Sequence, residues 1–134
     1  MDTTALAIAA TTLPEVELVV LFGSAATGRQ RPDSDVDVGV LLSEDNIATR
    51  ESVLVTLGQA ISWPLDLTVL NDAGPQLKFE IAKGKLIFER RPGVWRDMKA
   101  RAMLEWWDWQ GTARWMHGIY AERLRKQVGA SRGS

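Results

Sequence analysis

Two short motifs in the first third of the chain combine residue types that handle phosphate and metal ions. Gly23 and Ser24 close an apolar run, residues 19–22, and ten residues separate them from the pair Asp35 and Asp37. A Gly-Ser turn that opens a short helix aims free backbone N–H groups at an anion. Carboxylate oxygens suit magnesium, which usually binds one or two carboxylates together with the phosphates of a nucleotide. The two motifs therefore predict nucleotide chemistry.

Three carboxylates are expected to share one site. Asp35 and Asp37 alternate with valines, so the period of two along a strand puts both on one face. A third acid, Asp66, interrupts the apolar run of residues 65–70, which also has strand composition. An unpaired carboxylate among buried residues is costly, so Asp66 needs a chemical purpose. We expect it to join the other two.

The elements that position these motifs follow from composition and turn signals. Strands are expected at residues 17–22, 35–42, 65–70 and 85–89, and helices at 3–12, from the N-cap Ser43 to Ile61, and from Asn71-Asp72 to Gly84. One helical turn is expected at 24–28 and a loop at 29–34. The order αβαβαβαβ predicts an α/β fold, in which a small mixed β-sheet carries the acids and helices pack against it.

The C-terminal third of the chain has a helical pattern. From Pro92 on, apolar and aromatic residues recur at steps of three and four: Trp95, Met98, Ala102, Trp106, Trp109, Ala113, Met116, Tyr120, Leu124 and Val128. An unbroken helix of about 35 residues would be about 50 Å long. A domain of this size cannot cover that length, so we expect a break at Gly111 or Gly118. Such a stripe usually forms core or a protein interface rather than a platform for nucleotide bases.

Size and charge limit the possible classes of protein. A chain of 134 residues forms one domain, and we expect a core at 1–90, a helical extension of the same domain at 91–129 and a flexible tail at 130–134. Residues 1–89 hold 6 Lys/Arg and 13 Asp/Glu, whereas residues 90–134 hold 10 and 4. The acidic part fits a carboxylate site for metal. The basic part could dock an acidic protein surface or a nucleic acid, or it could simply be solvated.

The absence of cysteine excludes disulfide scaffolds, thiol nucleophiles and thiolate zinc sites. The N-terminal residues lack the basic start of a secretory signal, and no apolar run approaches the ~20 residues that span a bilayer. We therefore expect a cytoplasmic protein that does not bind membranes.

The complete pattern of Gly23-Ser24, Asp35-Val36-Asp37 and a distant strand acid, Asp66, resembles nucleotidyltransferases of the polymerase-beta type. The segments 23–28, 34–37, 66–71 and 79–85 are similar to the minimal nucleotidyltransferase (MNT) family, the MntA-like antitoxins of HEPN/MNT toxin-antitoxin pairs. This resemblance implies a polymerase-beta-type fold over nearly all of residues 1–90, followed by a helical C-terminal extension.

The resemblance also implies an enzyme that transfers AMP from ATP to a hydroxyl group, expected to be a tyrosine of a partner HEPN ribonuclease toxin, which it thereby neutralises. Asp35 and Asp37 are expected to hold two Mg²⁺ ions, and Asp66 to bind the ion nearest the acceptor and to take the hydroxyl proton. Gly23 and Ser24 are expected to bind the β and γ phosphates. Direct binding of nucleic acid is not expected.

One position departs from the family pattern. Thr27 stands where these proteins commonly carry Arg before the second glycine, so the usual Arg contact to phosphate lacks its donor. Arg29 or Arg31 could replace it, but exposed loop arginines without such a task are common, and both stay outside the predicted site. His117 lies too close to Arg114 in the sequence for the Arg-and-His pattern of HEPN ribonucleases, so no nuclease activity is assigned.

Two alternative functions remain open. The C-terminal stripe and its arginines have the composition of an interface, so the chain could neutralise a partner by binding alone, without catalysis. It could also modify a small hydroxylated molecule such as an aminoglycoside, although the sequence leaves little room for a dedicated acceptor pocket.

Overall fold

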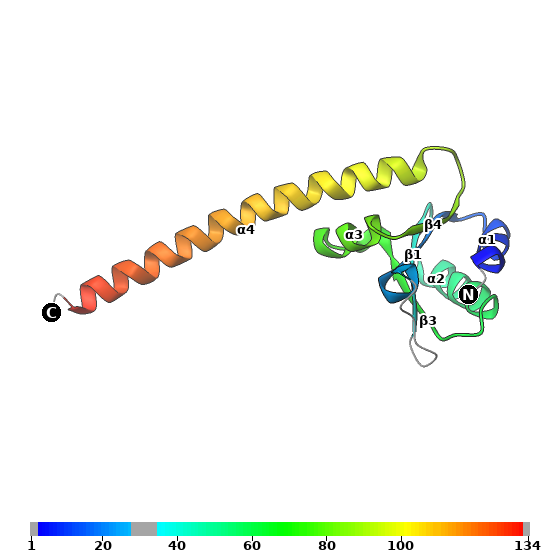
Figure 1. Ribbon diagram of the computed structural model, residues 1–134, viewed down its shortest axis with the longest axis horizontal. Coiled ribbons are helices and arrows are strands. Elements are labelled where there is room, and N and C mark those ends of the chain that lie inside the picture. Colours follow the sequence, from blue (N-terminus) through cyan, green and yellow to red (C-terminus); the bar gives the residue numbers. More distant parts are fainter. Residues whose placement is uncertain (1–2, 28–34, 133–134) are drawn as a thin grey trace.

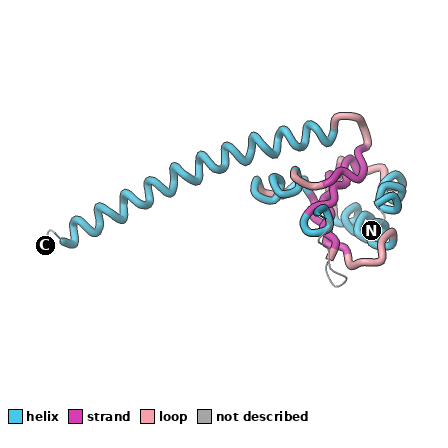
Figure 2. Tube along the Cα trace, in the orientation of Figure 1, coloured by secondary structure: helices cyan, strands magenta, loops and turns pink. Residues whose placement is uncertain are grey.

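The computed structural model describes residues 3–27 and 35–132, which form a four-stranded sheet, helices on both of its faces and one long helix that runs past it (Figure 1). The elements in chain order are α1 (Thr3–Thr11), β1 (Val16–Phe22), the 3-10 helix η1 (Gly23–Thr27), β2 (Val36–Leu42), α2 (Ile47–Gln59), β3 (Leu65–Val69), the 3-10 helix η2 (Leu70–Asp72), α3 (Pro75–Ala82), β4 (Lys85–Glu89) and α4 (Val94–Arg132). Figure 2 separates helices from strands along the same trace. The predicted order αβαβαβαβ and the mixed sheet are confirmed.

The sheet brings the predicted motifs to one edge. Its strand order is β3-β2-β1-β4, with β1 antiparallel to β2 and β4, and β2 parallel to β3. Because parallel strands start at the same edge, the N-terminal ends of β2 and β3 lie next to each other. The end of β1 reaches the same edge, since Phe22 pairs with Asp37.

One face of the sheet packs against α1 and α2. Alternate residues of β2, namely Val36, Val38 and Val40, are fully buried in a cluster with Leu6 of α1 and Leu57 of α2. Burial of one such side chain contributes roughly 1.5–3 kcal/mol relative to an exposed one. This face therefore anchors the sheet and carries none of the predicted site residues.

The opposite face packs against α3 and the first part of α4. Leu18 of β1 and Ile81 of α3 are buried in a second cluster, against which Met98 of α4 packs. Gly39 allows this close approach, because a Cβ at its position would lie 3.2 Å from Cγ2 of Ile81. Strand alternation puts Asp37, two residues before Gly39, on this same face. Helices α3 and α4 thus cover part of the face that carries the acid.

The predicted N-cap of α2 is wrong. The helix is capped by Asn46, whose Oδ1 accepts a hydrogen bond from the Thr49 N–H at 2.8 Å. Ser43 lies outside the helix, and its backbone N–H donates to the carbonyl of Glu15 at 2.8 Å. Asparagine and serine are both good N-caps, so the backbone contact with a distant segment decided between them.

The predicted cap of the next helix is also wrong. Asn71 belongs to η2, and α3 starts at Pro75 after the N-cap Gly74. The side chain of Asn71 instead accepts a hydrogen bond from the Leu42 N–H at 2.9 Å and donates one to the Leu42 carbonyl at 2.7 Å. It therefore fastens η2 to the end of β2.

Helix α4 is continuous over 39 residues, so the predicted break at Gly111 or Gly118 is wrong. Glycine in a helix costs only about 0.5–1 kcal/mol relative to alanine, and the surrounding helix formers offset this. The excess length is left uncovered, as Figure 1 shows. No helix within the described ranges combines the length and apolar character needed to cross a membrane.

Other predicted boundaries are only partly described. The tail predicted at 130–134 falls partly within α4 and partly outside the described residues. The loop predicted at 29–34 lies entirely outside the described residues, which resume at Asp35. The division into a core at 1–90 and an extension at 91–129 stays a prediction.

Candidate active site

The turn after β1 depends on Gly23. Its φ angle is +69°, in the left-handed region that residues with a side chain rarely adopt. A Cβ at this position would collide with Oδ2 of Asp37. Glycine thus lets the backbone of the turn pass directly beside a carboxylate, which joins the two motifs that lie apart in the sequence.

The short helix η1 holds the rest of the Gly-Ser motif. Oγ1 of Thr27 donates a hydrogen bond to the carbonyl of Ser24 at 3.0 Å, which closes the turn. Successive backbone N–H groups in such a turn can hold an anion. Thr27 therefore has a structural contact here, whereas Arg29 and Arg31 lie outside the described residues.

Asp37 and Asp66 occupy paired positions on β2 and β3. Residues in register on parallel strands project from the same face, so both carboxylates lie on the face covered by α3 and α4. Burial raises the pKa of Asp37, and the charge of Asp66, a hydrogen bond with Asp66 and then the charge of Asp35 raise it further. Burial is the main cause of this shift, and the smaller part comes from neighbouring like charges, whose repulsion a cation would relieve.

The other two acids are more open than the sequence suggests. Asp35 lies one residue before β2, and its side chain is exposed. Asp66 is exposed as well, because β3 is an edge strand of the sheet. The expectation that the carboxylate of Asp66 is buried is therefore wrong, although Val69 and Leu70 of the same apolar run are buried. Its expected proximity to Asp37 agrees with the strand register.

The donor set suits a hard divalent cation. Within residues 3–27 and 35–132, no three His, Asp or Glu side chains already form a group that could hold a metal ion. The pair Asp37 and Asp66 nevertheless offers carboxylate oxygens from neighbouring strands, and Mg²⁺ binds such oxygens together with substrate phosphates. The residues fit a magnesium ion that arrives with a nucleotide rather than one held by a complete protein cage.

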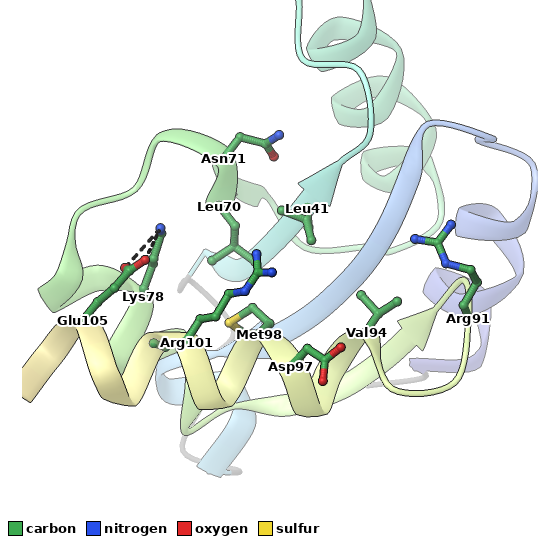
Figure 3. Close-up of a pocket in the computed structure, with 11 residues that line it drawn as sticks. Leu41, Leu70, Asn71, Lys78, Arg91, Val94, Asp97, Met98, Arg101 and Glu105 are labelled. Carbon is green, nitrogen blue, oxygen red and sulfur yellow. Dashed lines mark hydrogen bonds and ion pairs between the residues drawn. The ribbon is translucent and has the colours of Figure 1, made fainter.

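A cavity of about 430 Å³ lies on the same side of the sheet, between α4 and the ends of β2 and β3 (Figure 3). It is lined by Leu41, Leu70, Asn71, Lys78, Arg91, Val94, Asp97, Met98, Arg101, Ala102 and Glu105. Leu41 is four residues beyond Asp37 and Leu70 four beyond Asp66, so about 13 Å of strand separates the cavity from the acids.

Several charges at this cavity are already paired. Nζ of Lys78 lies 3.2 Å from Oε2 of Glu105, which joins α3 to α4, and Arg91 contacts Glu17 at 2.9 Å. Arg101 has no ion-pair partner in the described part of the chain, and its side chain extends toward Leu70 in Figure 3. The sequence did not predict this cavity, because its lining residues come from distant segments, and the charges of a helix do not indicate which element it will pack against.

The family of the protein is established by its sequence. Residues 6–92 match the family described as "Polymerase beta, Nucleotidyltransferase". This match covers more than half of the chain and spans β1 to β4, so the chain belongs to this nucleotidyltransferase family. The resemblance predicted from the Gly-Ser turn and the three acids is confirmed.

Known relatives make the likeness more specific. The chain is 37% identical to protein adenylyltransferase MntA of Shewanella oneidensis over 67 residues, 48% of each chain. The match thus spans about half the length of this curated relative.

Two solved structures have a similar fold. The crystal structure of a toxin-antitoxin with AMP-PNP has a TM-score of 0.76 at 19% identity and covers 90% of this chain and 99% of that one. The tri-AMPylated Shewanella oneidensis HEPN toxin in complex with MNT antitoxin has a TM-score of 0.62 at 18% identity and covers 83% and 87%. At these identities the likeness shows the fold, and the predicted fold class is confirmed.

Proposed function

We propose that this protein transfers AMP from Mg-ATP to a tyrosine hydroxyl of a partner HEPN ribonuclease toxin and thereby neutralises the toxin. The observation that carries the proposal is the meeting of Gly23, Asp37 and Asp66 at one edge of the sheet in a nucleotidyltransferase chain. Similarity to an adenylyltransferase, and a fold shared with an MNT antitoxin in complex with an AMPylated HEPN toxin, support the class of acceptor.

Each site residue would have a separate task. Asp35 and Asp37 would hold two magnesium ions, which when bound would neutralise charge on the entering and leaving oxygens. Asp66, exposed on the edge strand, would complete the ligands nearest the acceptor and take the proton of its hydroxyl. Gly23 and Ser24 would bind the β and γ phosphates through backbone N–H groups and the Ser24 hydroxyl.

The reaction is a displacement at the α-phosphorus. The acceptor oxygen forms a bond to this phosphorus while the bond to the oxygen between the α and β phosphates breaks, and pyrophosphate leaves with the electron pair. The acceptor proton passes to Asp66 and then to solvent. The product is a phosphodiester between AMP and the acceptor, without any redox change.

The open position of two of the acids leaves them accessible to a macromolecular acceptor. Asp35 and Asp66 are exposed at the edge of the sheet. The cavity near Leu41 lies roughly 13 Å away along the strands, too far for a small molecule bound there to present its hydroxyl to the acids. A protein can rest on one surface and present a side chain at another.

The test uses the purified protein, Mg²⁺, ATP and the HEPN protein encoded beside it. Intact-mass measurement should find AMP on the HEPN protein, and Asp37→Asn should slow this transfer by about a thousandfold or more. Asp72→Asn is a matched control, because Asp72 is an exposed acid that pairs with Arg50 away from the site. Absence of AMP on the partner, or transfer undiminished in Asp37→Asn, would refute the proposal.

Neutralisation by binding alone is a second candidate function. It is favoured by large apolar side chains exposed on α4, including Met116 and Tyr120. The Asp37→Asn protein separates the two candidates. If it still inhibits the toxin fully and carries no transfer activity, binding is sufficient; if it binds but no longer inhibits, modification is required.

A further inference from the structure

The side of α4 that faces the core continues beyond the core as a stripe without a partner. Met98 packs against the cluster under α4, and Ala102 is only 1% exposed. Steps of three and four residues stay on one side of a helix. They lead from Ala102 through Trp106 and Trp109 to the distal stripe, which we define as Ala113, Met116, Tyr120 and Leu124.

Contacts between α4 and the core end before the distal stripe. The ring of Trp106 stacks on Phe79 of α3 at 4.7 Å and on Trp109 at 5.2 Å, measured between ring centroids. Among the described side chains, no hydrogen bond, ion pair or ring contact joins positions 110–127 to the core. Met116 is 60% exposed and Tyr120 63%. An apolar stripe that continues a core-facing stripe into solvent indicates a docking surface.

The distal stripe faces the side of the sheet that carries the acids. The first part of α4 packs over the face to which Leu41 belongs, and strand alternation puts Asp37 on that face too. A partner bound to the distal stripe therefore lies beyond α3, on the side of α4 that turns toward this face rather than toward α1 and α2. The helix continues well past α3 in Figure 1.

The charges around the stripe select the chemistry of the partner. Residues 110–132 hold five Lys/Arg and one Glu, and Arg123 lies one helical turn from Tyr120. Met116 and Leu124 are aliphatic and cannot stack on nucleotide bases, so the stripe suits a protein better than RNA. From Ala113 to Leu124 it runs about 17 Å, the length of a few helical turns. An amphipathic helix with acidic flanks is complementary to it in shape and charge.

We propose that the distal stripe is the docking surface for the acceptor protein, which it binds through an amphipathic, acid-flanked helix on the acid-bearing side of the sheet. This inference rests on the proposed function, because it concerns the macromolecule that receives AMP. Binding at the stripe holds the acceptor near the acids and so makes the attack effectively intramolecular. The stripe positions the acceptor and touches no reacting atom.

The test compares Met116→Glu with Trp107→Glu in the full-length protein. Both side chains are 60% exposed, but nine residues, or two and a half turns, put them on opposite sides of α4. Met116→Glu should raise the Kd for the HEPN protein, and the KM for it as acceptor, by about tenfold or more. ATP binding by calorimetry and the melting temperature should stay unchanged. Trp107→Glu should leave all four quantities near their wild-type values.

Several outcomes would overturn this assignment. They are an unchanged Kd in Met116→Glu, an equal loss of binding in both variants, single-stranded RNA that binds the wild type but not Met116→Glu, and a wild-type dimer in ultracentrifugation that Met116→Glu dissociates. A wild type that binds the HEPN protein but transfers no AMP would refute the proposed function instead, and the Kd comparison would still test the stripe.

Discussion

The glycines at the acid site and those of α4 show how differently the two regions are determined. A Cβ at Gly23 would meet Asp37, and one at Gly39 would meet Ile81, whereas nothing lies within 4 Å of a Cβ at Gly111 or Gly118. Contacts between distant segments define the edge of the sheet, and among the described residues no such contact reaches the distal half of α4. The apolar pattern of that half therefore cannot be explained by the protein's own core.

The first part of α4 is packed against the core. Glu89 accepts a hydrogen bond from the Trp95 N–H at 3.0 Å, at the start of the helix. Lys78 and Glu105 then join α3 to α4. One helix thus changes from a packed element to an exposed one near Trp109, without any break in its backbone.

Among substitutions that compare the two regions, Gly23→Ala should have the largest effect, a loss of AMP transfer. Alanine would have to keep a φ of +69° and place its Cβ against Asp37, so the turn must shift. A displacement of about 1 Å can cost about a hundredfold in rate, and we expect at least that loss in initial rate. Gly111→Ala, the same substitution in the exposed helix, should transfer AMP at the wild-type rate. A fully active Gly23→Ala protein would mean that the turn does not hold the phosphates.

Truncation of an apolar side chain should lower the free energy of unfolding much more in the buried region than on the exposed part of α4. Ile81 is 0% exposed, so Ile81→Ala should lower the free energy of unfolding by about 2–5 kcal/mol. Leu124 is 46% exposed, and Leu124→Ala should change it by less than about 0.5 kcal/mol. Urea titration followed by circular dichroism measures both. Equal losses would show that the distal stripe is packed in the free protein.

Substitution of Gly111 by alanine should stabilise the protein locally, whereas the same substitution at Gly23 should disturb its turn. Gly111→Ala adds a methyl group in open space, so it should stabilise the helix locally by about 0.5–1 kcal/mol. Hydrogen exchange of the amides around position 111 should become slower, while exchange in β1 and β2 stays unchanged. Faster exchange around position 111 would show that the added methyl group disturbs the helix, and would contradict the open space around Gly111.

The smallest effect is expected on the pH dependence of stability, from the ion pair between Arg50 and Asp45 on the surface of the α/β part. Hydrogen bonds from Arg50 at 2.6 and 2.8 Å lower the pKa of Asp45 from 3.8. The pair therefore stabilises the fold above that value, and this contribution disappears as the pH falls through the lowered pKa. Below pH 3.8 the melting temperature of the wild type should fall slightly more steeply than that of Arg50→Gln. Parallel pH profiles would show that the pair contributes nothing measurable.

Much of the candidate site could be proposed from the sequence because its signals are local. The alternation of Asp35 and Asp37 with valines and the Gly-Ser turn each lie within a few residues of sequence. The caps of α2 and α3 were predicted wrongly, because Ser43 and Asn71 are bonded to segments far away in the chain. Local propensity cannot rank such contacts against a helix cap.

The sequence by itself determined which segments become strands, which side of each strand bears an acid and which family the chain belongs to, since periodicity and motif spacing are properties of neighbouring residues. Only the tertiary structure decided that Asp66 lies in register with Asp37, and that it does so on an exposed edge. It also decided that α4 stays whole beyond the core. Strand register and helix coverage depend on surfaces that meet only when distant segments pack together.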